Sequence, residues 1–358
     1  MFTPDNNMIG CGGPLTLAVA ISQIKERRRS PRTGATVLIP PCTPIQRTTP
    51  SGDLSNSDAN IYAPKYLLNE FKNGHKTVRV YRGMVVKLYK GDADVASCAT
   101  HEHRMAVLFA NHPHIMNARG DIVFNQPRNL TVLRFTNHGF ELNDAINRGM
   151  TVAQKVLVVS QIASAVQFMH SKGYVHRDIK MDNVCVSRTT TAATSGGARL
   201  NHVVATLVDL ETCMVADEIN PHHAVGTRAY FHPKMMTNAA QKRAPYADLS
   251  VYEVDVWAFA VMVLVMFREQ HAWSVPHASN RNYQKFQSYV FDTPSAWVED
   301  LRIVQSAGLN RNVVAENMVY TALRVLRTYH QSPPTALESR EGHDNSPASI
   351  MEAFTWRP

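Results

Sequence analysis

Alternating apolar and polar residues predict a strand-rich region that begins shortly after residue 60. Three segments rich in β-branched and aromatic residues follow one another there, at residues 66–71, 75–81 and 84–89. The dipeptides Asn73-Gly74 and Arg82-Gly83 separate them, and such dipeptides between apolar segments favour tight hairpin turns. The pattern therefore predicts strands joined by tight turns, with a further strand at residues 129–135.

Helical periodicity replaces this alternation later in the chain. Between residues 151 and 172 the apolar side chains share one helical face: Val152, Val156, Val159, Ile162, Val166 and Met169. Thr151 and Gln154 have the spacing of a capping box, and Gly173 is a typical helix stop. The same reasoning predicts an amphipathic helix at residues 312–329 and a short terminal helix at 348–356.

A helix predicted at residues 94–111 carries an acid within its apolar face. Glu102 shares that face with Val95, Cys98, Met105 and Phe109. An unpaired carboxylate in such a position would cost several kcal/mol by general estimates, roughly the penalty for a stranded buried charge. Glu102 therefore needs a cation, and Lys87, on the preceding strand, is the natural partner.

Composition limits the class of protein. The 358 residues are enough for one two-lobed domain with tails, and 44% hydrophobic content is ordinary for a packed protein. The longest apolar run, residues 256–267, is shorter than the roughly twenty residues that cross a membrane, so we expect a buried core helix and a soluble protein. Five scattered cysteines indicate a reducing intracellular compartment without a disulfide framework or zinc site, and the first residues lack the basic region of a secretory signal.

The net charge of +8 leaves several partners open. A basic surface can meet nucleic acid, an anionic membrane or acidic protein substrates, although a solvated surface is the favoured interpretation. Residues 1–60 are rich in Pro, Ser, Thr and Gly, and we expect this arm to be mostly disordered. Its basic segment at residues 25–32 fits a nuclear-import or nucleic-acid patch, and a solubilising tail fits it equally well.

Residues 174–183 contain the segment HRDIKMDN, around which the chain is organised. Asp178, Lys180 and Asn183 supply a carboxylate, an ammonium and an amide, the three side-chain types that phosphoryl transfer to a hydroxyl needs. A polar structural turn is the alternative interpretation. The preceding helix, its glycine stop and this spacing resemble the eukaryotic-type protein kinase superfamily.

The resemblance covers about residues 61–356 and implies an α+β, two-lobed kinase fold. The small β-rich lobe would span about 61–135 and the larger helical lobe about 139–356, with residues 1–60 as a separate arm. Phe135, Thr136 and Asn137 would offer backbone groups to adenine at the hinge. Glu141 would contact the ribose or a basic substrate side chain.

The same resemblance assigns roles to single residues. Asp178 would orient the substrate hydroxyl and accept its proton, Lys180 would stabilise the transferred group, and Asn183 with Asp209 would bind Mg²⁺. Lys87, positioned by Glu102, would bind the phosphates of ATP. Gly74 stands in the turn that would cover those phosphates. Asp255 would hold the backbone of the catalytic loop, with a plain helix N-terminal acid as the alternative.

The chain departs from the family pattern in two parts of the nucleotide site. The phosphate loop has one glycine, Gly74, instead of three, which gives a poorer backbone cradle unless His75 or Lys76 compensates. Asp209 is followed by Leu210 and Glu211, where the family has Phe and Gly, so a second acid stands beside the metal-binding residue.

Two further departures lie in the helical part. Pro233 is retained at the end of the activation segment, but both halves of the family's late ion pair are replaced, the acid by Lys234 and the arginine by Pro333 within residues 332–336. Residues 187–201 look like a surface loop longer than usual. We expect a divergent kinase, and the trimmed loop and insertions resemble a viral one.

The part of the activation segment at residues 213–225, ahead of Gly226, contains no Ser, Thr or Tyr. In the family an arginine at the position of Arg177 often pairs with a phosphorylated residue of this segment. We hypothesise that Asp217 or Glu218 takes the place of that phosphate. Solvated loop acids are the alternative interpretation.

The resemblance implies a serine/threonine protein kinase that uses ATP and Mg²⁺ and acts on protein hydroxyls, and we expect it in the cytoplasm or nucleus. Lys180 and Thr227 favour Ser/Thr over Tyr substrates. The alternative is a pseudokinase scaffold that binds nucleotide weakly and acts through protein partners, suggested by the lone Gly74 and by Glu211. Nucleic-acid attachment through residues 25–32 is a third hypothesis, and no membrane partner is expected.

Overall fold

The computed structural model describes residues 66–191, 200–247, 249–271, 273–292, 313–331 and 346–355. The predicted arm at 1–60 with its basic segment, and residues 332–336, lie outside the described residues. The chain divides into two compact units. Among the described residues, 66–100 and 118–137 belong to the first unit, and the remainder, including 101–117, to the second.

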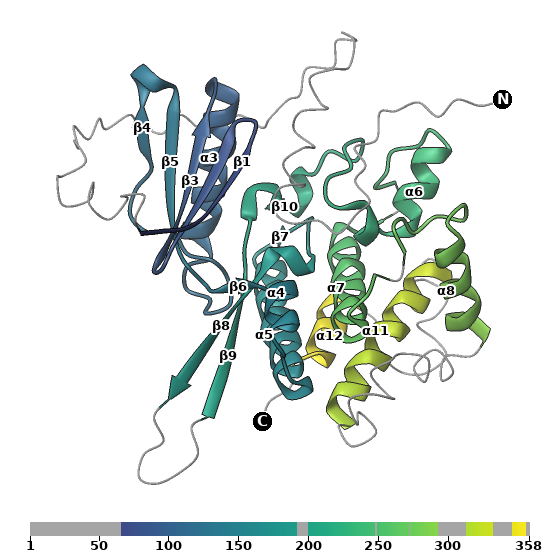
Figure 1. Ribbon diagram of the computed structural model, residues 1–358. Helices are drawn as coiled ribbons and strands as arrows, with labels where there is room; N and C mark the ends of the chain where they lie inside the picture. Colours follow the sequence, from purple (N-terminus) through teal and green to yellow (C-terminus); the bar gives the residue numbers. More distant parts are fainter. Residues whose placement is uncertain are drawn as a thin grey trace. The chain divides into compact units, whose positions relative to one another are not determined.

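The first unit is built on an antiparallel sheet with the strand order β1-β2-β3-β5-β4 (Figure 1). The strands are β1 (Leu67–Asn73), β2 (Lys76–Tyr81), β3 (Met84–Lys90), β4 (Val123–Asn125) and β5 (Leu130–Thr136). Asn73 pairs with Lys76 and Tyr81 with Met84, so the predicted turns at Asn73-Gly74 and Arg82-Gly83 are confirmed. Gly74 has φ 53°, a left-handed conformation that glycine adopts without steric cost.

The sheet is held by side chains that alternate along its strands. Buried residues on β2, β3 and β5 form the core of this unit: Val78, Tyr81, Val86, Tyr89, Leu133 and Phe135. Lys87 lies in the centre of β3, where its register partners are Val78 and Leu133 on the two neighbouring strands. Strand β4 has only three residues, too few for an alternating pattern to predict it.

Helices dominate the second unit. They are α4 (Leu142–Asn147), α5 (Val152–Ser171), α6 (Pro233–Ala240), α7 (Val251–Arg268), α8 (Arg281–Asp292), α11 (Val313–Gln331) and α12 (Pro347–Ala353). Helix α3 (Ala93–Leu108) starts in the sequence of the first unit and ends in that of the second. Short 3₁₀ turns occur at η2 (Gln126–Arg128), η3 (Met181–Asn183), η4 (Leu210–Thr212), η5 (Ala216–Glu218) and η6 (Arg228–Tyr230).

Helices α5 and α7 form the centre of this unit and pack on each other, and α11 and α12 pack against both (Figure 1). The capping box of α5 is confirmed, because Thr151 and Gln154 each accept a backbone N–H from the other. Gly173, with φ 78°, follows the helix as predicted. Every residue from Val254 to Phe267 of α7 is buried, as expected for a core helix.

Among the described residues, α5 alone is long and apolar enough to cross a membrane by length and composition. Half of its apolar window is buried inside the protein, and the helix packs on β9, α7 and α12. The core helix of a soluble protein meets the same criterion.

The described part of the second unit also contains two small sheets. One has the order β6-β8-β9, with β6 (Phe140–Glu141), β8 (Val184–Thr191) and β9 (Leu200–Leu207), and the other pairs β7 (Tyr174–Val175) with β10 (Met214–Val215). The expected surface loop at 187–201 is wrong at its two ends, because β8 and β9 continue as one ladder to Thr191 and Leu200, while 192–199 lie outside the described residues. The β-branched threonines of this segment favour a paired strand, whereas their polarity suggested a loop.

Candidate active site

The catalytic loop is fixed to helix α7 by one carboxylate. Asp255 is 1% exposed, and its two oxygens accept the backbone N–H groups of His176 at 2.7 Å and Arg177 at 2.8 Å. His170, at the end of α5, donates from Nε2 to the same carboxylate at 3.0 Å. Burial alone would raise the pKa of Asp255, but the hydrogen bond and charge of His170 hold it below its ordinary value. The predicted role of Asp255 is confirmed.

His170 was not identified from the sequence. It lies close to the end of an apolar helix, where a lone histidine has no pattern that distinguishes it from a surface residue. Only the fold brings it to Asp255, which is 85 positions later in the chain. Its side chain is 8% exposed, so the contact is shielded from water.

Asp178 is surrounded by three side chains that orient its carboxylate. Lys180 Nζ donates to Oδ2 at 2.7 Å, Asn183 Nδ2 donates to the same oxygen at 3.0 Å, and Thr227 Oγ1 donates to Oδ1 at 2.8 Å. Lys180 Nζ also donates to Thr227 Oγ1 at 2.9 Å. The structure thus brings the three residues of the predicted catalytic loop together and adds Thr227 from the activation segment.

Lys180 remains positively charged although its side chain is buried. It is 4% exposed, and burial by itself would lower the pKa of its ammonium group. The adjacent Asp178 outweighs burial, with help from Asp209 and Asp182, and the pKa is raised above its ordinary value. A cation is therefore fixed beside the carboxylate.

Gly226 allows Thr227 to approach Asp178. Its φ of 115° lies in the region that favours glycine, and a Cβ atom there would collide with the carbonyl oxygen of Arg177. The same Cβ would lie 3.5 Å from Asp178 Oδ1. A glycine directly before Thr227 is thus a steric requirement of this contact.

Asn183 and Asp209 have the chemistry of Mg²⁺ ligands. Asn183 is 1% exposed, and its Nδ2 is used by Asp178, while its Oδ1 has no hydrogen-bond partner. Its backbone carbonyl accepts the N–H of Val208 at 2.9 Å, so it lies beside the residue that precedes Asp209. A buried amide oxygen left without a donor next to a carboxylate fits a hard cation.

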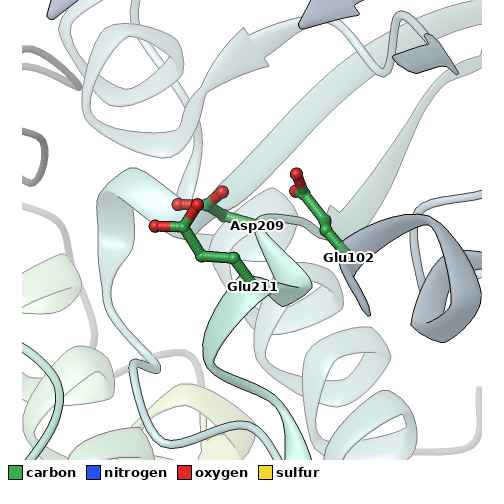
Figure 2. A group of neighbouring side chains, drawn as sticks. All are labelled: Glu102, Asp209 and Glu211. Atoms are coloured by element: carbon green, nitrogen blue, oxygen red, sulfur yellow. The ribbon is translucent and has the colours of Figure 1, made fainter. Parts of the chain in front are cut away.

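Asp209 is held in a special backbone conformation. Its φ of 65° and ψ of 67° are left-handed, and its N–H lies 3.1 Å from the sulfur of Met116. Glu102, Asp209 and Glu211 each offer a carboxylate oxygen, and these oxygens lie within 4.8 Å of one another (Figure 2). Glu102 is fully buried, as its place in the apolar stripe of α3 predicts.

Lys87 and the Gly74 hairpin, which are predicted to bind the nucleotide, belong to the first unit. Lys87 is 7% exposed, and its Nζ lies 5.5 Å from the centre of the Phe135 ring. Glu102 belongs to the second unit, so its pairing with Lys87 stays a prediction. In the Gly74 hairpin, His75 Nδ1 donates to the carbonyl of Lys90 at 3.0 Å, and Lys76 lies over the ring of Tyr89.

The hinge residues are also tied into the first unit. Phe135 and Thr136 pair with Val85 and Met84 on β3. The backbone N–H of Asn137 donates to the carbonyl of Gly83 at 3.4 Å, and its side chain donates to the carbonyl of Tyr81 at 2.6 Å.

Two acids beside the catalytic loop have raised pKa values. Burial, together with the charges of Asp182 and Asp144, raises the pKa of Glu141 to about 7. Burial also raises the pKa of Asp182 to about 6, against the attraction of Lys180 and a hydrogen bond from Asn143 at 2.8 Å. The resemblance predicts a role for Glu141 but none for Asp182, although Asp182 directly precedes Asn183.

The hypothesis about Arg177 is wrong for this structure. Its guanidinium donates to the sulfur of Met214 at 3.7 Å and to the carbonyl of His223 at 3.5 Å. Asp217 and Glu218 are exposed on the turn η5, so within the described residues they are the solvated acids of the alternative interpretation. Further contacts of the activation segment are the β7–β10 pair and the hydrogen bond that Trp273 Nε1 donates to the carbonyl of Ala229.

A strand-rich unit, a helical unit and a loop that presents a carboxylate beside an ammonium and an amide define the two-lobed α+β kinase fold. The family model described as protein kinase domain matches residues 76–322. The chain belongs to the protein kinase family. Members of this family generally use ATP and Mg²⁺ and act on protein substrates.

Curated relatives carry related names at low identity. Serine/threonine-protein kinase ppk8 of Schizosaccharomyces pombe is 25% identical over 199 residues, which cover 53% of this chain and 34% of that protein. Serine/threonine-protein kinase 10 of Rattus norvegicus is 25% identical over 169 residues, 47% of this chain and 16% of that protein. Nitrogen permease reactivator protein of Saccharomyces cerevisiae is 23% identical over 238 residues, 65% and 25% respectively. The chain thus spans about a third or less of the length of these relatives.

Proposed function

We propose that this chain is a serine/threonine protein kinase that transfers the γ-phosphoryl group of ATP to hydroxyl groups of proteins. The observation that carries the proposal is the carboxylate of Asp178, oriented by Lys180, Asn183 and Thr227 over distances of 2.7–3.0 Å. Asp255 fixes the backbone that presents it. Such preorganisation lowers the barrier because the groups are already in place when the substrate binds.

In the proposed reaction the substrate hydroxyl oxygen attacks the γ-phosphorus and forms a new P–O bond. The bond from the γ-phosphorus to the β,γ-bridging oxygen breaks, and ADP leaves with that electron pair. Asp178 accepts the hydroxyl proton, and Lys180 neutralises charge on the transferred group. Asn183 Oδ1 and the Asp209 carboxylate would hold Mg²⁺, which offsets the charge of the phosphates when bound.

Thr227 supports a preference for serine and threonine. Its hydroxyl bridges Lys180 and Asp178, so it narrows the space in front of the catalytic carboxylate. A short aliphatic hydroxyl reaches a carboxylate placed in this way more easily than a phenol on a large ring. The names of two relatives agree with this preference, which remains part of the proposal.

On the nucleotide side, Lys87 with Glu102 would bind the phosphates and residues 135–137 would face adenine. The single Gly74 provides fewer close backbone N–H groups than a loop with three glycines. We therefore propose a higher KM for ATP than such a loop would give. Gly74 and Glu211 are also the residues that favour the alternative, a pseudokinase scaffold.

The test is transfer of labelled phosphate from ATP to a mixed protein substrate and to water. Asp178→Asn and Asp209→Asn should each lower turnover by about a thousandfold or more, since one removes the base and the other a metal ligand. Asp217→Asn is the matched control, because Asp217 is an exposed acid outside the site. Equal turnover in the wild type and both site variants would support the scaffold. Phosphotyrosine as the main product would refute the Ser/Thr assignment alone.

A further inference from the structure

Three carboxylates, those of Glu102, Asp209 and Glu211, lie close together in the second unit, and the reaction proposed above uses only Asp209 of them to bind the metal. Figure 2 shows Asp209 and Glu211 rising from one turn with their carboxylates together, and Glu102 beside them on helix α3. Their nearest oxygens lie within 4.8 Å of one another. Glu102 is fully buried, Asp209 is 8% exposed and Glu211 is half-buried.

Ionised carboxylates at this separation repel one another, and the repulsion grows when water is excluded. A divalent cation bound between them converts the repulsion into attraction. Carboxylate oxygens are the ligands that Mg²⁺ and Mn²⁺ prefer. Because Glu211 is only half-buried, an ion can reach the group from solvent.

Asn183 gives an independent indication of a ligand at this place. Its Oδ1 is buried and has no hydrogen-bond partner. Its Nδ2 is turned toward Asp178, so Oδ1 faces away from Asp178. Its backbone is bonded to Val208, which leads directly into the turn with Asp209 and Glu211. An amide oxygen without a donor is a group that a cation satisfies.

We propose that Glu211 is a metal ligand in its own right, and that it binds a divalent cation together with Asp209 and Glu102 before any nucleotide arrives. Glu211 stands where the family pattern has glycine, so this ligand is particular to the chain. The inference rests on the proposed function only for the identity of the ion, Mg²⁺.

The experiment measures metal binding by the full chain without ATP. Mn²⁺ is the probe, and the loss of the free Mn²⁺ signal in electron paramagnetic resonance reports binding; Mg²⁺ should compete. Glu211→Gln should weaken binding by at least about tenfold, as expected for a lost ligand. Glu211→Gly, which restores the family residue, should have the same effect. Glu218→Gln changes an exposed acid seven positions later and should bind like the wild type.

Thermal unfolding gives the second readout, since a ligand that binds only the native state raises Tm. Mn²⁺ should raise the Tm of the wild type and of Glu218→Gln more than that of either Glu211 variant. No Mn²⁺ binding by the wild type without ATP, or unchanged binding in both Glu211 variants, overturns the inference. If the chain still transfers phosphate in that case, the proposed kinase function is supported although the metal-ligand inference fails. The remaining outcome is that the wild type binds Mn²⁺ without ATP, the Glu211 variants do not, and the chain transfers no phosphate. That outcome supports the metal site and refutes the proposed kinase activity.

Discussion

Replacing Asp255 by asparagine should uncouple the catalytic loop from helix α7. The carboxylate accepts two backbone N–H groups, from His176 and Arg177, and one N–H from His170. Asparagine keeps one acceptor oxygen and turns an NH₂ group toward a second donor. At least one buried N–H then loses its partner, and the charge that favours all three bonds disappears.

The expected loss of folding free energy is about 3–5 kcal/mol. Hydrogen bonds to charged groups contribute roughly 1.5–3 kcal/mol each, and breaking a buried charged network at one partner costs about 3–5 kcal/mol. His170→Ala removes only one of the three bonds, so we expect about 1–3 kcal/mol for it. Because the two residues share one bond, the double variant should lose less than the sum of the single losses.

Urea unfolding followed by tryptophan fluorescence measures these losses. Trp257 is fully buried two positions after Asp255 and reports on the same helix. Asp217→Asn, an exposed carboxylate exchanged for the same amide, is the matched control and should change stability by less than about 0.5 kcal/mol. An Asp255→Asn protein within about 1 kcal/mol of the wild type would refute the reasoning, and so would strictly additive losses with His170→Ala.

Three further predictions follow from the same unit. Burial raises the pKa of Glu141 from 4.5 to about 7, so ionisation of this carboxyl group destabilises the fold as pH rises from about 4.5 to about 7. In chemical denaturation, Glu141→Gln should therefore be more stable than the wild type at pH 8, by up to about 3 kcal/mol, and equal to it at pH 4. Gly226→Ala should lower phosphoryl transfer and Tm together, because the new Cβ meets the carbonyl of Arg177. The double change Asp217→Ala with Glu218→Ala should leave activity unchanged, and a loss of activity would restore the acid–Arg177 pair. Phosphatase treatment should also leave activity unchanged, and a loss there would mean that a phosphorylated residue activates the chain.

Local patterns predicted the features that depend on neighbouring residues. The turn at Asn73-Gly74 needs only a glycine at positive φ between two apolar segments. The cap of α5 is complete within Thr151 and Gln154. The motif around Asp178 fixed the spacing of its own partners, because Lys180 and Asn183 lie two and five positions away.

Features that depend on distant residues were missed or misjudged. His170 matters only because the fold places it beside Asp255. The hairpin of β8 and β9 resembles a polar loop in composition, and its strands are set by pairing between the two segments. Asp217 and Glu218 lie about forty positions after Arg177, and the turn η5 exposes them, while the sulfur of Met214 and the carbonyl of His223 accept from the guanidinium instead.

The groups that position Asp178 all come from the second unit: Asp255, Lys180, Asn183 and Thr227. Within the described residues, the contacts that orient the catalytic loop are therefore found inside the second unit, and in the proposed reaction Lys87 of the first unit acts on the nucleotide. Lys87→Met should therefore lower phosphoryl transfer strongly while the pH-dependent stability due to Glu141 stays unchanged. If Lys87 and Glu102 pair as predicted, Glu102→Gln should add little to the loss in the Lys87→Met background, and the double-mutant cycle measures that coupling. Fully independent losses would mean that Glu102 serves the metal group alone.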